Sequence, residues 1–192
     1  METSNSAVLV KQIYQSKLEL FTTKTLRDLL GSNVPQATFF SMLARLTRQN
    51  VLQKLERDKY ALVGGRVHDF RIANFLYEPS YVSLETALNF HGVLSQFPYE
   101  VASITTRKPL TKTVDEKTYR YARIKRSLFW GYEPIQGFLI AQPEKALLYL
   151  LYLMSKGLAI VHTDELEPSK LDKARFTLYA KKFPSMKGTD IL

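Results

Sequence analysis

Cysteine is absent from this chain of 192 residues. Without thiols the protein can form neither disulfides nor thiolate metal sites, and cysteine-based catalysis is excluded. The three histidines, His68, His91 and His162, lie far apart and lack the H-x-x-x-H spacing of a metal-binding helix. No glycine-rich phosphate loop and no G-x-S-x-G motif occurs either. We therefore expect a protein that needs no cofactor and is not an enzyme.

Long hydrophobic runs are also missing. The longest one, Ala146 to Met154, contains two tyrosines and is too short to span a bilayer. The segment from Met1 to Ala7 is polar and acidic, whereas a signal peptide would begin with basic and then apolar residues. These features predict a cytoplasmic protein that makes no contact with a membrane.

Positive charge, in contrast, is abundant. The formal net charge is +9, and 45% of the residues are hydrophobic, which is enough to build a core. Residues 1–64 hold nine Lys or Arg against five Asp or Glu, and residues 65–192 hold eighteen against thirteen. A basic chain favours a polyanionic partner, but because both halves are basic, charge alone does not say which half binds it.

Residues 20–64 have the sequence pattern of two short helices and a hairpin. The first helix is predicted over Thr23 to Leu30, with Thr22 or Thr23 capping its free amides and Gly31 ending it. Pro35 suits the first turn of a second helix, where a missing amide donor costs nothing. That helix can run to Asn50, because no Gly or Pro interrupts it.

The second helix has two chemically different faces. Its apolar residues recur at the three-and-four spacing of a buried stripe: Phe39, Met42, Leu43 and Leu46. On another side the same spacing gives Thr38, Ser41, Arg45 and Arg48, a small polar face that becomes basic toward its end. Such a face suits a helix in the DNA major groove, with Gln36 contacting a base edge or a phosphate.

Val51 to Glu56 and Tyr60 to Val63 alternate like a two-stranded ribbon around a basic tip with Arg57 and Lys59. Beside a groove-reading helix, such a tip can bind the DNA backbone or the minor groove. We therefore predict a winged helix-turn-helix DNA-binding domain over residues 1–64. An ordinary amphipathic helix with a solvated charged face, or a winged helix that docks a protein, are the alternatives.

Residues 65–192 begin after Gly64-Gly65 and are predicted to form an α+β domain with a mixed or antiparallel sheet, because strand-like runs follow one another directly. The strands are expected at 101–107, 118–125, 128–132 and 137–141. Residues 68–77 are expected to form a linking helix, and the polar run 108–115 a hairpin loop.

Residues 107–126 hold eight bases and two acids, including Arg107, Lys108, Arg120, Arg123 and Lys125. Tyr119 and Tyr121 lie among them. Aromatic side chains beside cations can stack on bases while the cations hold phosphates. The strand expected at 118–125, with the basic residues near it, is therefore a candidate RNA-binding surface. In the alternative, the tyrosines cover a core and the charges face solvent.

Glu144 and Lys145 fall in the first turn of a helix that Pro143 starts. An acidic residue there interacts favourably with the helix dipole, which explains Glu144 without a partner. A specific contact with a partner protein or with another domain is the functional alternative for this pair.

Four blocks of the second half resemble the conserved region of AbiEi-type antitoxins. They are Tyr81 to Leu88 with His91-Gly92, Ile104 to Lys108, Tyr119 to Ile124 with Phe129 to Tyr132, and Ala141 to Leu148. They occur in the family's order over about residues 81–155. An amino-terminal winged helix is also typical of this family.

The resemblance implies an antitoxin of a two-gene toxin–antitoxin system used in phage defence. Its winged helix would bind inverted repeats of double-stranded DNA in the operon promoter and repress it. Its second domain would antagonise a nucleotidyltransferase toxin. Where the family leads us to expect an acidic residue, this chain has Tyr149. A stand-alone regulator without antitoxin activity, or an RNA- or protein-interaction module, is therefore the alternative.

Overall fold

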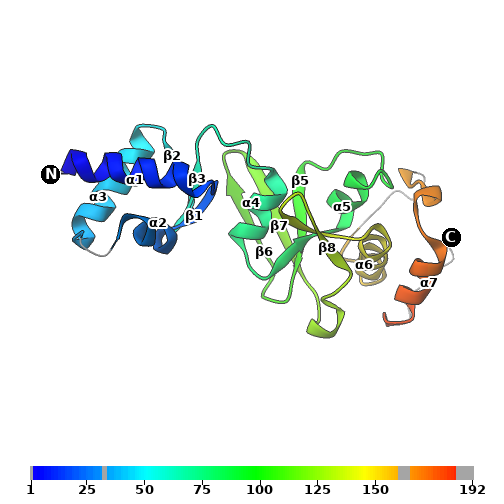
Figure 1. Cartoon of the computed structure of the whole chain (residues 1–192). Helices are drawn as coiled ribbons and strands as arrows, with labels where there is room; N and C mark the ends of the chain where they lie inside the picture. The colour runs from blue at the N-terminus through cyan, green and yellow to red at the C-terminus, as the bar shows by residue number, and fades with distance from the viewer. Residues whose placement is uncertain (1, 32–33, 160–164, 185–192) are drawn as a thin grey trace. The chain divides into compact units, whose positions relative to one another are not determined.

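The protein is an α+β protein, and its computed structural model describes residues 2–31, 34–159 and 165–184 (Figure 1). The chain divides into two compact units, one ending at His68 and the other beginning at Asp69. The boundary predicted from the Gly64-Gly65 pair thus lies four residues before the division between the units. No helix among the described residues is long and apolar enough to cross a bilayer.

The first unit combines three helices with a small sheet. In chain order its elements are α1 (Glu2–Ser16), β1 (Leu20–Thr22), α2 (Thr23–Leu30), α3 (Gln36–Arg48), β2 (Leu52–Glu56) and β3 (Lys59–Leu62). The sheet has the order β1-β3-β2, and both pairings are antiparallel. Sequence analysis missed β1, since a strand of three residues between two helices leaves almost no alternating pattern.

Local signals explain where α2 and α3 begin and end. The Thr22 side chain accepts a hydrogen bond from the amide of Thr25 at 3.0 Å, which satisfies a free donor at the start of α2. Gly31 ends this helix at φ +87°, a conformation that disfavours residues with a Cβ. Pro35 is the cap residue before α3 and lies just outside the helix. Thr22 and Gly31 act as the sequence predicts, whereas Pro35 lies one position before the first turn in which it was predicted.

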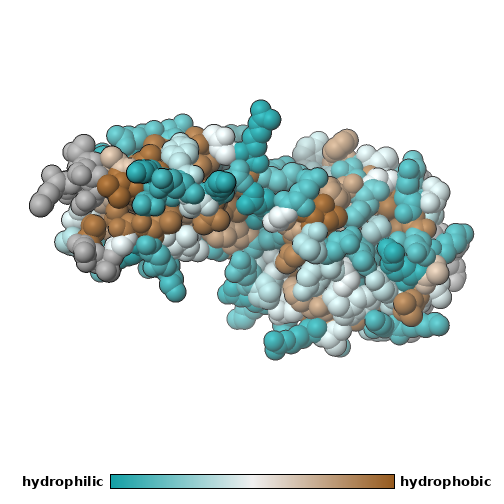
Figure 2. All heavy atoms as spheres, viewed as in Figure 1, coloured by the Kyte–Doolittle hydropathy of each residue, from teal (hydrophilic) through white to brown (hydrophobic). Residues whose placement is uncertain are grey.

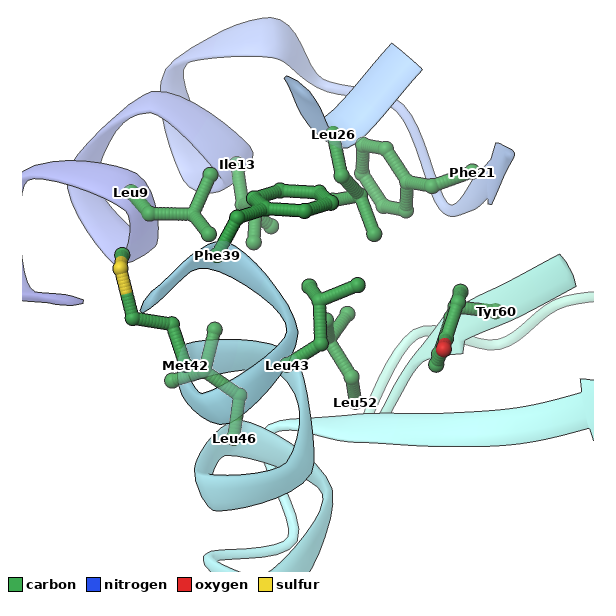
Figure 3. Close-up of a cluster of buried hydrophobic side chains, with 10 residues drawn as sticks. All are labelled: Leu9, Ile13, Phe21, Leu26, Phe39, Met42, Leu43, Leu46, Leu52 and Tyr60. Carbon is green, nitrogen blue, oxygen red and sulfur yellow. The ribbon is translucent and has the colours of Figure 1, made fainter. Parts of the chain in front are cut away.

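The core of the first unit is one cluster to which every helix contributes (Figure 3). All four residues of the predicted apolar stripe of α3 are buried: Phe39, Met42, Leu43 and Leu46. They pack with side chains of α1, α2 and the sheet, namely Leu9, Ile13, Phe21, Leu26, Leu52 and Tyr60. The burial of α3 confirms the predicted stripe and fixes which side of this helix faces outward.

The second unit contains a larger sheet with helices on both of its faces. Its elements are α4 (Asp69–Leu76), β4 (Ser80–Val82), α5 (Leu84–Phe90), β5 (Glu100–Thr105), β6 (Leu110–Val114), β7 (Lys117–Arg123), the 3-10 helix η1 (Arg126–Leu128), β8 (Tyr132–Ile135), β9 (Phe138–Ala141), α6 (Pro143–Ser155), the 3-10 helix η3 (Pro168–Lys170) and α7 (Lys173–Ala180).

The six strands are ordered β6-β7-β5-β4-β9-β8. β5 runs parallel to β7 and β4 runs parallel to β9, whereas the other pairings are antiparallel. The sheet is therefore mixed, as the sequence analysis allowed. In the β5–β7 pair, Thr105 lies beside Arg123, so the carboxyl ends of the two parallel strands lie next to each other.

Alternation along β7 shows which helices cover which face of the sheet. Tyr119 and Tyr121 are buried, and the Tyr121 hydroxyl donates to the carbonyl of Ala73 in α4 at 2.7 Å. Arg120 lies between them in the sequence and contacts Glu85 of α5 at 3.3 Å. Because successive side chains of a strand point to opposite faces, α4 and α5 cover opposite faces of this sheet.

Three sequence predictions for this unit are wrong. The run expected as a hairpin loop, 108–115, contains strand β6, which lies at the sheet edge and is polar because much of it is exposed to solvent. The strand expected at 128–132 is absent, and η1 ends where it should begin. The helix expected as a linker packs on the sheet as α4, because Phe70, Ala73 and Leu76 give it an apolar side.

Candidate functional site

The outward face of α3 consists of Ala37, Ser41, Ala44 and Arg48, all of which are exposed. These residues recur at the three-and-four spacing on the side opposite the buried stripe. Three of the four are small, so another molecule can approach the helix backbone closely. The single charge, that of Arg48, lies in the last turn of the helix.

Arg45 and Thr38 lie at one border of this face and are half-buried. The Arg45 guanidinium donates a hydrogen bond to the hydroxyl of Ser6 in α1. The sequence analysis placed both residues on the open polar face, and this is corrected here: α1 packs beside α3 and covers part of that face. Arg45 still carries a positive charge next to the outward face, but its direction is set by α1.

Gln36 is exposed at the start of α3 and lines a groove of about 610 Å³. The first turn of α2 with Thr23 and Lys24, the side of α3 with Phe40, and the hairpin residue Lys59 form its other walls. The groove therefore joins all three parts of the predicted DNA-binding region: the first helix, the second helix and the hairpin tip.

The hairpin tip is attached to the beginning of α2. The Thr23 amide donates to the carbonyl of Asp58 at 2.9 Å, and its hydroxyl lies 3.2 Å from the Asp58 carboxylate. Arg57 is 95% exposed, with the Asp58 carboxylate 3.8 Å away. The ammonium of Lys59 pairs with Glu56 at 2.8 Å, and Lys59 belongs to β3 and not to the tip. Of the two basic residues predicted to contact DNA, Arg57 is thus more available for such a contact than Lys59.

Sequence reasoning missed Phe40, which borders both the groove and the outward face. Its ring is 44% exposed and lies edge-on to Phe39 with 5.5 Å between the ring centroids. Hydrophobic residues reach the visible surface of the first unit, as Figure 2 shows in brown. The sequence does contain a signal for Phe40: it directly follows the buried Phe39, and helical spacing turns the next residue away from the core.

The basic strand of the second unit is mostly occupied by contacts within that unit. Arg120 forms ion pairs with Glu85 and Glu100 from neighbouring elements. Tyr119 and Tyr121 are buried, so they cannot stack on a base in this structure. The tyrosines therefore cover a core, as the alternative expected, whereas Arg120 pairs with local acids and was expected to face solvent.

Arg107 and Lys108 lie where the chain leaves β5, and both are exposed. The Arg107 guanidinium stacks over the Tyr77 ring at 4.3 Å and donates to the carbonyl of Glu78 at 3.1 Å. The carbonyl of Lys108 accepts a hydrogen bond from the Tyr77 hydroxyl at 3.1 Å. Both residues therefore help to hold the end of α4 against the sheet.

Arg123 and Lys125 have a different environment. Together with Arg126 they surround a pocket of about 620 Å³ that Tyr152 of α6 also lines. We call this the basic pocket. All three cations are exposed, and the described part of the chain offers their side chains no ion pair and no hydrogen bond. The sequence analysis named Arg123 and Lys125 but not Arg126 or Tyr152, which come from other elements.

Glu144 is buried in the first turn of α6 and contacts the start of α7. Its carboxylate accepts a hydrogen bond from the amide of Asp172 at 2.9 Å and lies 3.5 Å from the guanidinium of Arg175. Glu144 lies in the first turn of α6, as predicted, and it joins α6 to α7 within the second unit. The contact with a partner protein or with another domain stays a prediction.

Lys145 is fully buried, although the sequence analysis offered it for contact with a partner protein or another domain. Its ammonium lies 3.9 Å from the centroid of the Trp130 ring and 4.2 Å from that of Phe183, and the described residues give it no hydrogen-bond partner. Burial, followed by the charge of Lys182, lowers the pKa of Lys145 from 10.5 to about 7. A Cβ at Gly131 would lie 2.9 Å from the Lys145 side chain, so only glycine fits there.

Among the described residues no group of three or more His, Cys, Asp or Glu side chains could hold a metal ion. Two surfaces of the described residues carry the predicted basic side chains: the outward face of α3 with its groove in the first unit, and the basic pocket in the second.

The α+β fold of this chain resembles that of a protein of known structure. The chain is similar in structure to the RV2827C protein from Mycobacterium tuberculosis, with a TM-score of 0.63 and 14% sequence identity. The similarity covers 94% of this chain and 72% of that protein. No protein-family model matches the sequence, and no curated protein matches it. At this identity the similarity concerns the fold alone.

Proposed function

We propose that the first unit is a winged helix-turn-helix domain that binds double-stranded DNA through the outward face of α3. The observation that carries this proposal is the element order: helix, strand, two helices and a two-stranded hairpin, closed by an antiparallel sheet with β3 at its centre. The small outward face supports it, because Ala37, Ser41 and Ala44 allow the backbone of α3 to enter a major groove.

In this arrangement each basic residue has a separate role. Arg48 at the end of α3 reaches a base edge or a phosphate, and Arg45 beside it adds charge from a position fixed by Ser6. Gln36 contacts the DNA from the start of the helix, while Arg57 at the hairpin tip binds the backbone or the minor groove. Lys59 contributes less, because Glu56 already neutralises it.

We further propose that the protein is an AbiEi-like antitoxin that represses its own operon and antagonises a nucleotidyltransferase toxin. The four sequence blocks that resemble this family support the proposal. All of them lie in the second unit, and the winged helix proposed for the first unit is a domain that members of this family also carry. The toxin is the proposed functional antagonist, and the proposed DNA target is the inverted repeats of the operon promoter.

Replacing Arg48 with alanine is expected to weaken binding to the operon promoter about tenfold or more. A base contact is worth about 1–3 kcal/mol, and a phosphate contact changes the logarithmic salt dependence by about one unit. Fluorescence anisotropy with a labelled promoter duplex at several salt concentrations measures both quantities. The Arg45→Ala/Arg48→Ala double variant should bind more weakly still.

Lys11→Ala is the matched control, because Lys11 is exposed on α1 and its replacement removes the same charge. Its affinity should stay within about twofold of the unmodified protein. Undiminished binding by the Arg45→Ala/Arg48→Ala variant would show that α3 does not read the DNA. Equal losses in the control and in Arg48→Ala would reduce the interaction to general charge attraction.

The antitoxin proposal predicts that expressing this chain from a foreign promoter restores growth to cells that express the nucleotidyltransferase encoded beside it. The Arg45→Ala/Arg48→Ala variant should rescue growth equally well, because antagonism would lie in the second unit. Colony counts under separate induction of the two genes measure the effect. Failure to rescue, despite intact promoter binding, would identify a stand-alone regulator, the alternative that Tyr149 suggests.

A further inference from the structure

The basic pocket lies at the carboxyl ends of two parallel strands of the large sheet, β5 and β7. Arg123 is the last residue of β7, and Thr106, which follows the last residue of β5, also lines the pocket. Parallel strands bring the residues after their carboxyl ends together, and in open sheets this edge is where ligands commonly bind. The location therefore depends on the pairing of β5 with β7, which no sequence pattern revealed.

The charge of the pocket is entirely positive. Arg123, Lys125 and Arg126 contribute three cations, and none of the described residues that line the pocket is acidic. This distinguishes them from the other bases of the same stretch: Arg120 pairs with two glutamates, and Lys117 pairs with Asp69 at 3.3 Å. Neighbouring cations without acids repel one another, so an anion in the pocket would relieve that repulsion.

The walls of the pocket are apolar and aromatic. Ile124 and Leu128 are buried beneath it, and the half-buried Tyr152 supplies a ring. The position of Arg123 is fixed from below, because the hydroxyl of Tyr149 donates a hydrogen bond to its carbonyl. Burial raises the pKa of Tyr149, so this hydroxyl stays neutral and remains a donor.

A volume of about 620 Å³ is within the range of pockets that hold small ligands, roughly 300–1,000 Å³. Arginine guanidinium groups bind phosphate oxygens through paired hydrogen bonds, and aromatic rings stack on nucleobases of any sequence. We propose that the basic pocket binds a nucleotide, with its phosphates held by Arg123, Lys125 and Arg126 and its base stacked on Tyr152. The nucleotide is either free or the phosphorylated end of an RNA.

This inference does not depend on DNA binding by the first unit, and its test uses the complete chain. Isothermal titration calorimetry is carried out with ATP, with pyrophosphate and with a short RNA that carries either a 5′-phosphate or a 5′-hydroxyl. These ligands separate the contributions of the phosphates, of the base and of the RNA chain to the binding affinity. ATP should bind, and the Arg123→Ala/Arg126→Ala variant should bind it at least tenfold more weakly. Tyr152→Leu should weaken ATP binding severalfold and leave pyrophosphate binding unchanged.

Lys170→Ala/Lys181→Ala is the matched control, because both lysines are exposed in the same unit and the same charge is removed. It should bind ATP as the unmodified chain does. Tighter binding of the 5′-phosphorylated RNA than of ATP, lost in the pocket variant, would identify the RNA end as the source of the phosphate. Absence of binding, or equal losses in the pocket and control variants, would overturn the proposal. Equal losses of ATP and pyrophosphate in Tyr152→Leu would overturn the stacking of the base.

Discussion

Replacing Phe39 with alanine is expected to lower the free energy of unfolding of the first unit by about 3–5 kcal/mol. Phe39 is 1% exposed at the centre of the cluster to which α1, α2 and α3 contribute (Figure 3). The change removes the ring and leaves a cavity that these helices cannot fill without moving. It also removes the ring over which Arg27 lies, at 5.1 Å from its centroid. DNA binding should then fail through loss of the fold.

Hydrogen exchange of the α3 amides measures this loss of stability, because opening of the first unit exposes them. Trp130 is the only tryptophan and belongs to the second unit, so its fluorescence reports that unit separately. Phe40→Ala is the matched control: the chemical change is identical, but the ring is 44% exposed, and the expected cost is about 1 kcal/mol. Similar costs for the two variants would mean that α3 is not oriented as described.

Replacing Lys145 with methionine is expected to remove about 3–4 kcal/mol of the pH dependence of stability between pH 7 and pH 10, because each pH unit between the two pKa values contributes about 1.4 kcal/mol. The pKa of Lys145 is about 7 in the folded protein and about 10.5 in an unfolded chain. Between these values the unfolded state binds more protons, so the stability of the unmodified protein rises with pH and is lost as the pH falls toward 7.

Urea unfolding followed by Trp130 fluorescence at several pH values measures this difference. Lys182→Gln is the informative companion variant, because the Lys182 charge is the second cause of the lowered pKa. It should raise the pKa of Lys145 and flatten the pH dependence only in part. If the stability curves of the unmodified protein and of Lys145→Met run parallel from pH 7 to pH 10, Lys145 is not a buried group that titrates in this range.

Much of the first unit follows from local signals. Thr22, Gly31 and Pro35 each act on backbone groups within a few residues of themselves, so they define α2 and the start of α3 without help from the rest of the chain. The buried stripe is equally local, because helical spacing alone brings Phe39 and Leu43 to one side. The exposure of Arg45 could not be deduced in this way, since it depends on where α1 packs.

The second unit shows what local patterns miss. Strand β6 looked like a loop because an edge strand buries little and therefore carries few apolar residues. The burial of Lys145 could not be predicted, because lysine is rarely buried and the rings that surround it come from residues 15 and 38 positions away. In both cases the deciding contacts are distant in sequence.

The amino-acid sequence by itself determined the α+β class, the excess of positive charge, the ends of α2 and the buried side of α3. These properties depend on composition or on neighbours within one helical turn. Only the tertiary structure decided which basic side chains are available to bind a ligand. Strand pairing and helix packing neutralise Arg120, direct Arg45 toward α1 and bury Lys145, whereas the parallel ends of β5 and β7 leave Arg123 facing an open pocket. Electrostatic function depends on distances in space, and these are fixed only when the chain folds.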